Sequence, residues 1–154
     1  MGPDEPATRG YRFLPHTADK AIEAWGRSLP DLFAAAAEGM FAESADLDSV
    51  PREREWAVEV EGETLEDLLH AWLSELLWPA ERDGAAFCEF QVEIAREGPW
   101  RLRGRARGGP VSPERPHTGA PVKAVTYHGL QVWQAEPAEC REGACWRARV
   151  VFDV

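Results

Sequence analysis

The chain has 154 residues and a net charge of −10, from 27 acidic and 17 basic side chains. This length fits one domain, expected over residues 1–154, and a 44% share of hydrophobic residues can form its core. Nucleic-acid binding depends mainly on neutralised phosphates, so this acidic chain favours a basic protein partner or a cation over RNA. The chain has no apolar run near the roughly 20 residues that span a bilayer. Residues 1–10 lack the apolar region of a signal peptide, so we expect a cytoplasmic protein without membrane contact and with a flexible start.

The first half of the chain predicts two short strands, at residues 11–14 and 21–26, and then an amphipathic helix. Between Leu29 and Phe41, apolar residues recur at i, i+3, i+4, i+7 and i+8, which is one helical face. Ser28 stands where an N-cap is expected. Residues 55–61 follow as a strand, because apolar and acidic side chains alternate there.

A second amphipathic helix is predicted from residue 65 to residue 77, where leucines and Trp72 share one face and His70 lies on the other. Thr64 resembles the first residue of a capping box, and Pro79 is expected to end the helix. Strict alternation then predicts strands at residues 88–94, 100–107 and 146–153. Residues 122–134 are strand-like, with a bulge or bend expected at Gly129.

The order of elements predicts an α+β fold, with a largely antiparallel sheet and two amphipathic helices packed on one face. Four prolines and three glycines in residues 108–121 indicate an exposed loop. The cysteines, Cys88, Cys140 and Cys145, match no zinc pattern, so we expect mostly reduced thiols in the cytoplasm. The sequence predicts no particular oligomeric state.

Few residues suggest chemistry, since the chain lacks a nucleophile elbow, a phosphate-binding glycine loop, an HExxH motif and a dinucleotide fingerprint. One candidate segment runs from His16 to Asp19, where a plain turn is the alternative. Another holds Lys123 and His128, which could equally be a surface lysine and a half-buried histidine.

The third candidate segment is the end of the chain, where the strand pattern continues through Asp153 to Val154. It would fix the carboxylate of Asp153 beside the α-carboxylate of Val154. Two such groups repel each other unless a cation or an arginine neutralises them. The alternative is a solvated tail that Arg147 and Arg149 compensate.

Together these segments resemble the archease family, in the order and spacing that the family shows. The matching residues are His16-Thr17-Ala18-Asp19, Leu68-Leu69-His70-Ala71-Trp72-Leu73-Ser74-Glu75-Leu76-Leu77, Lys123-Ala124-Val125-Thr126-Tyr127-His128 and Phe152-Asp153-Val154. The resemblance covers residues 11–154. One departure is Gly108-Gly109-Pro110, where family members often carry Gly-Glu-Pro, so no role of that glutamate transfers to this chain.

The resemblance implies a non-enzymatic accessory protein of an RtcB-type tRNA-splicing RNA ligase, which speeds guanylylation and turnover of the ligase and meets tRNA only through it. It also implies a divalent cation bound by Asp19, Asp153 and Val154. Two aspartates and a terminal oxygen suit Ca²⁺, with Mg²⁺ and Mn²⁺ as alternatives. His16, Lys123 and His128 are candidate contacts to the partner.

Other functions compete with this interpretation. Arg101, Arg103, Arg105 and Arg107 alternate along one strand beside Trp100 and could bind RNA, unless neighbouring acidic residues pair with them. A chaperone-like modulator of tRNA-modifying enzymes is a related possibility that the family suggests. A metal-dependent hydrolase would need a general base besides the aspartates, and only His16 is available.

Overall fold

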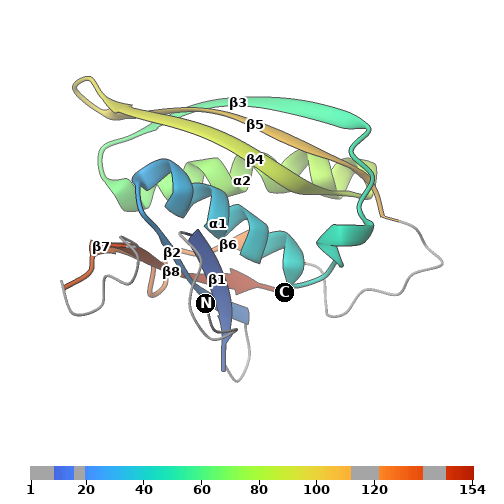
Figure 1. Cartoon of the computed structure of the whole chain (residues 1–154), viewed down its shortest axis with the longest axis horizontal. Coiled ribbons are helices and arrows are strands. Elements are labelled where there is room, and N and C mark those ends of the chain that lie inside the picture. Colours follow the sequence, from blue (N-terminus) through green and yellow to red (C-terminus); the bar gives the residue numbers. More distant parts are fainter. Residues whose placement is uncertain (1–8, 16–19, 112–121, 137–144) are drawn as a thin grey trace.

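The computed structural model describes residues 9–15, 20–111, 122–136 and 145–154, which form three layers with two helices between two antiparallel sheets (Figure 1). The elements are β1 (Arg9–Leu14), β2 (Lys20–Gly26), α1 (Leu29–Ala42), the short 3₁₀ helix η1 (Leu47–Ser49), β3 (Arg54–Gly62), α2 (Leu65–Asp83), β4 (Ala85–Arg96), β5 (Trp100–Pro110), β6 (Ala124–Val125), β7 (Gln131–Gln134) and β8 (Trp146–Asp153). The predicted α+β class is confirmed. Each sheet has the helices on one face, but the strands divide between two sheets.

One sheet has the order β1-β2-β8-β6, with β7 also paired to β8. In its centre β2 and β8 run antiparallel, with Lys20 opposite Phe152 and Gly26 opposite Trp146. Strands β6 and β7 both pair with β8, and the chain turns between them at Gly129, whose φ is +69°. The bend expected at Gly129 is therefore confirmed, and it splits the predicted strand into two.

The other sheet has the order β3-β5-β4, and its outer face is a ladder of opposite charges. The four ion pairs join Arg101 to Glu61 at 3.6 Å, Arg103 to Glu59 at 3.1 Å, Arg105 to Glu55 at 3.5 Å and Arg107 to Glu89 at 3.7 Å. Three of the four acidic partners lie on β3 and the fourth, Glu89, lies on β4, so the alternative in which neighbouring acidic residues pair with the arginines is confirmed. Because every arginine of the row has an acidic partner, the row offers little net charge to phosphates.

Both helices begin where the sequence predicts. The Ser28 hydroxyl accepts a hydrogen bond from Asp31 N at 3.2 Å, and Thr64 accepts one from Asp67 N at 3.1 Å. The predicted end at Pro79 is wrong, because α2 continues to Asp83 and is capped by Gly84 in the left-handed conformation. A proline inside a helix costs about 3 kcal/mol, and here the proline and the residue after it are buried, so tertiary packing offsets that cost.

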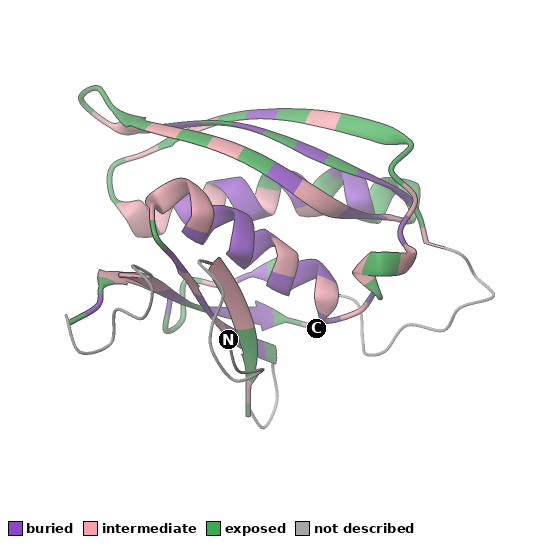
Figure 2. Cartoon of the chain, viewed as in Figure 1, coloured by how far each residue is buried: buried purple, intermediate pink, exposed green. Residues whose placement is uncertain are grey.

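The core lies between the sheets, and Figure 2 shows buried residues along both helices and at intervals along strands of both sheets. At its centre, the fully buried Trp72 of α2 donates its indole N–H to the Phe33 carbonyl of α1 at 3.0 Å. This bond satisfies the polar atom of a large buried ring and fixes one helix against the other.

The exposed loop predicted from residue 108 begins later than expected, since residues 108–110 belong to β5. Gly108 and Gly109 are buried, and a Cβ on Gly108 would lie 2.0 Å from the Ala86 carbonyl oxygen of β4. Glycine is needed there because the two backbones are too close for any side chain. The remainder of the predicted loop, residues 112–121, lies outside the described residues.

The cysteines differ from expectation in one respect. Cys88 is a free thiol, whereas Cys145 is disulfide-bonded, so the prediction of a reduced thiol is wrong for Cys145. Cys140 lies outside the described residues. Within the described part of the chain, neither helix is long and apolar enough to cross a membrane.

Candidate functional site at the β6–β8 edge

The predicted site residues fall into two groups. His16 and Asp19 lie outside the described residues. Lys123 lies immediately before β6, Asp153 ends β8, and both are exposed. They are neighbours through the backbone, since Lys123 N donates to the Asp153 carbonyl at 2.7 Å. Val154 follows Asp153 and is half-buried.

His128 is exposed in the turn that joins β6 to β7. This turn is closed by the hydrogen bond from Leu130 N to the Tyr127 carbonyl at 3.2 Å. The structure therefore brings Lys123, Asp153, Val154 and His128 to the same edge of one sheet.

The Asp153 carboxylate has no ion-pair partner among the described residues. Arg147, proposed from sequence as its compensating charge, binds Glu23 of β2 instead, with Nη1 2.8 Å from Oε1. Arg12 of β1 reaches the other oxygen of Glu23 at 3.2 Å. Of the two arginines in the alternative of a compensated tail, Arg147 therefore pairs with Glu23 and not with Asp153.

Asp153 could be one ligand of a cation, but the described residues alone do not form a complete cation site. Within the described ranges, no three His, Cys, Asp or Glu side chains gather closely enough to hold a metal ion. The Asp153 carboxylate remains available, and the register sets Lys20, which directly follows Asp19 in sequence, opposite Phe152. A hard cation needs several oxygen ligands, so Asp153 would require further ones.

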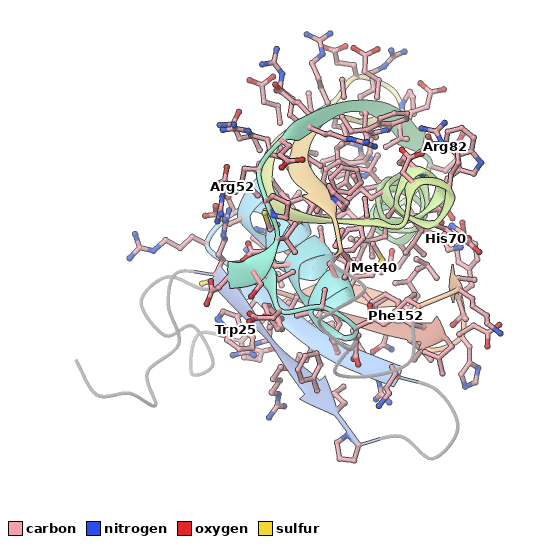
Figure 3. All side chains as sticks on the ribbon, turned by 90° about the vertical axis from the view of Figure 1, so that its right-hand side faces the viewer. Trp25, Met40, Arg52, His70, Arg82 and Phe152 are labelled. Atoms are coloured by element: carbon pink, nitrogen blue, oxygen red, sulfur yellow. The ribbon has the colours of Figure 1, made fainter. Side chains whose placement is uncertain are left out.

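Three side chains from the first half of α2 tie the segment 125–132 of the sheet to this helix, and we name them the α2 clamp: Glu66, Asp67 and His70. His70 Nε2 donates to the Val125 carbonyl at 3.0 Å. Glu66 Oε2 accepts from Val132 N at 2.9 Å. Figure 3 shows His70 beside α2, on the side that faces the sheet of β8.

Asp67 completes the clamp by accepting a hydrogen bond from the Tyr127 hydroxyl at 3.1 Å. The Tyr127 ring also stacks on His70, with centroids 4.1 Å apart and planes 11° apart. Partial desolvation and, second, the bond to Asp67 raise the pKa of the Tyr127 hydroxyl above its ordinary value. The hydroxyl therefore stays protonated and donates throughout the neutral range.

Sequence patterns did not reveal the clamp, since His70, Glu66 and Asp67 lie on the face of α2 that the periodicity assigns to solvent. Acidic residues in a first helical turn also have a local explanation, because they stabilise the positive end of the helix. Only the packing of α2 against the segment after β6 gives these side chains their partners.

Known proteins share this fold and sequence over almost the whole chain. The model of the Archease protein family matches residues 11–154. The chain is 41% identical over 142 residues to Protein archease of Methanopyrus kandleri, covering 92% of this chain and 96% of that protein. It is 33% identical over 147 residues to Protein archease of Pyrococcus furiosus, covering 95% and 99% respectively.

A solved structure agrees with these relatives. The solution structure of Methanobacterium thermoautotrophicum Protein 1598 superposes with a TM-score of 0.78 and 31% sequence identity, covering 94% of this chain and 99% of that one. The resemblance inferred from the motifs is thus confirmed by full-length similarity in sequence and in fold. The chain belongs to the archease family.

Proposed function

We propose that this archease is a non-enzymatic, cytoplasmic accessory protein of an RtcB-type RNA ligase. In this role it stimulates guanylylation and turnover of the ligase and meets tRNA only through it. The proposal is supported by family membership and by the exposed residues gathered at the β6–β8 edge. A net charge of −10 favours approach to the basic surface that an RNA-binding enzyme must have.

We further propose that Asp19, Asp153 and Val154 hold a divalent cation, with Ca²⁺ as the best match to an all-oxygen ligand set. The observation that supports it is the Asp153 carboxylate, which has no ion-pair partner in the described part of the chain while Arg147 binds Glu23. A bound cation would neutralise the carboxylate of Asp153, for which the described residues supply no ion pair. The role of the chain is to hold the oxygens in place and to present Lys123 and His128 beside them.

A guanylylation assay with purified ligase tests the proposal. Asp153→Asn keeps the size of the side chain and removes its charge, so we expect loss of Ca²⁺ binding by calorimetry together with loss of stimulation. Glu93→Gln is the matched control, because Glu93 is an exposed acidic residue on β4 of the other sheet. Full stimulation by Asp153→Asn would refute the cation site, and no stimulation by the unaltered protein would refute the accessory role.

A further inference from the structure

Tyr127 is one of three large hydrophobic side chains that the described residues leave exposed, with Phe13 and Trp78. Tyr127 is 57% exposed, yet neighbouring side chains fix both its hydroxyl and one face of its ring. The hydroxyl donates to Asp67, and one ring face is covered by the parallel ring of His70. The rest of the side chain accounts for its exposure and is open to a ligand.

The backbone beneath Tyr127 is fixed as well. On one side His70 bonds the Val125 carbonyl, and on the other Glu66 bonds the Val132 amide. Thr126 N donates to the Val151 carbonyl at 3.1 Å, which ties the intervening residue to β8. An aromatic side chain ordered before binding loses little conformational entropy when a partner covers it, so its burial can contribute almost fully to affinity.

From this arrangement we infer that Tyr127 is a preorganised contact residue for a basic protein surface, with Asp67 and His70 as its positioning residues. The inference deepens the proposed function and rests on it, since the partner is the ligase. The partner is a protein rather than a nucleic acid because the Asp67 carboxylate binds the tyrosine hydroxyl and Glu66, the residue before Asp67 in α2, adds a second negative charge to the clamp. Negative charge there repels phosphates and attracts lysine and arginine side chains.

The test is an equilibrium titration of purified RtcB-type ligase with the full-length protein. Tyr127→Ala should raise the dissociation constant at least about 10-fold, as loss of an interface hot spot does. Tyr127→Phe keeps the ring and its stack on His70, so it should stay within about threefold of the unaltered protein. Trp78→Ala is the matched control, because Trp78 is 58% exposed on the same helix and lies eight positions beyond His70; it should bind normally.

Thermal unfolding of each variant separates a binding defect from a folding defect. If Tyr127→Ala fails to fold, His70→Gln replaces it, since glutamine retains a donor for the Val125 carbonyl and removes the stacking ring. Weaker ligase binding by a folded variant, with Trp78→Ala unaffected, supports the inference.

Equal binding by Tyr127→Ala and the unaltered protein would overturn the inference and leave the accessory role standing. A loss confined to tRNA binding, or an equal loss in Trp78→Ala, would also overturn it. Absence of any ligase binding by the unaltered protein would overturn both this inference and the proposed function.

Discussion

Glu43, the residue that caps the C-terminal end of α1, provides a sharp test of the buried electrostatics. Glu43 is 8% exposed, and its Oε1 atom is shielded from solvent and has no hydrogen-bond partner among the described residues. Burial raises the pKa of this carboxyl above its ordinary value, and the positive charge of Lys20 offsets part of the rise. The Glu43→Gln substitution keeps the shape of the side chain and removes the charge, so it should stabilise the fold.

Two contributions set the expected gain in the free energy of unfolding. Both the carboxylate and the amide that replaces it are buried without a partner among the described residues, so the substitution removes only the larger desolvation cost of the charged group, on the order of 1 kcal/mol. A negative charge at the negative end of a helix adds about 0.3–1 kcal/mol. Because Lys20 compensates part of this cost, we expect Glu43→Gln to gain about 1–2 kcal/mol at neutral pH. For a chain of this length, that gain corresponds to a rise in Tm of roughly 2–8 °C.

Thermal and urea unfolding measured as a function of pH check the cause. Since the folded-state pKa of Glu43 is raised, the folded protein binds more protons than the unfolded chain above the ordinary value of 4.5. The stability of the unaltered protein therefore falls as pH rises from 4.5 through the folded pKa. The glutamine variant lacks this loss, so the two proteins should converge in stability below pH 4.5.

Glu81→Gln is the matched control, because Glu81 lies in the last turn of α2 and is exposed. Glu81→Gln also removes a negative charge from the negative end of a helix, but it removes no cost of burial. Its gain in stability should therefore be smaller than that of Glu43→Gln. Equal gains in the two variants, or a Glu43→Gln gain that persists at acid pH, would refute desolvation as the cause.

Three further substitutions test the packing. Gly108→Ala should lower the Tm by several degrees, because its Cβ would meet the Ala86 carbonyl at 2.0 Å; an unchanged melting curve would contradict the tight approach of β5 to β4. Trp72→Phe should cost about 2–4 kcal/mol in urea unfolding, since it leaves a cavity and removes the indole hydrogen bond to the Phe33 carbonyl; a cost under 1 kcal/mol would show that the indole N–H contributes little. Thr64→Ala should cost about 1 kcal/mol and lower helicity by circular dichroism, and no loss would mean that tertiary contacts alone fix the start of α2.

Much of the fold follows from local patterns in the sequence. The two amphipathic stripes and the caps at Ser28 and Thr64 locate both helices, and alternation locates the long strands. The errors arise where non-local packing outweighs local preference. Pro79 remains inside α2 because it is buried there, and Gly108 extends β5 because β4 runs so close. No alternation pattern reveals that the strands divide between two sheets, since that depends on which strands pair.

The candidate site was less predictable than the fold. Its members Lys123, Asp153 and His128 came from motifs, and the structure sets them along one sheet edge. The supporting contacts of His70 and Asp67 were missed, because a polar helix face looks the same in sequence whether it meets water or another segment. The partner of Arg147 was also missed, since Glu23 becomes its neighbour only when β2 pairs with β8.

The central position of β8 has a consequence for how the protein folds. Among the described strands, β8 is the one that joins the β1–β2 hairpin to β6 and β7, and its contact between Arg147 and Glu23 spans 124 positions of sequence. Closing so long a loop is entropically costly, and contacts between distant residues slow folding. During synthesis the β1–β2 hairpin leaves the ribosome before β8 does. Until β8 follows, the edge of β2 that pairs with β8 stays unpaired. The β6–β8 edge, with the proposed cation site, can form only after β8 is in place.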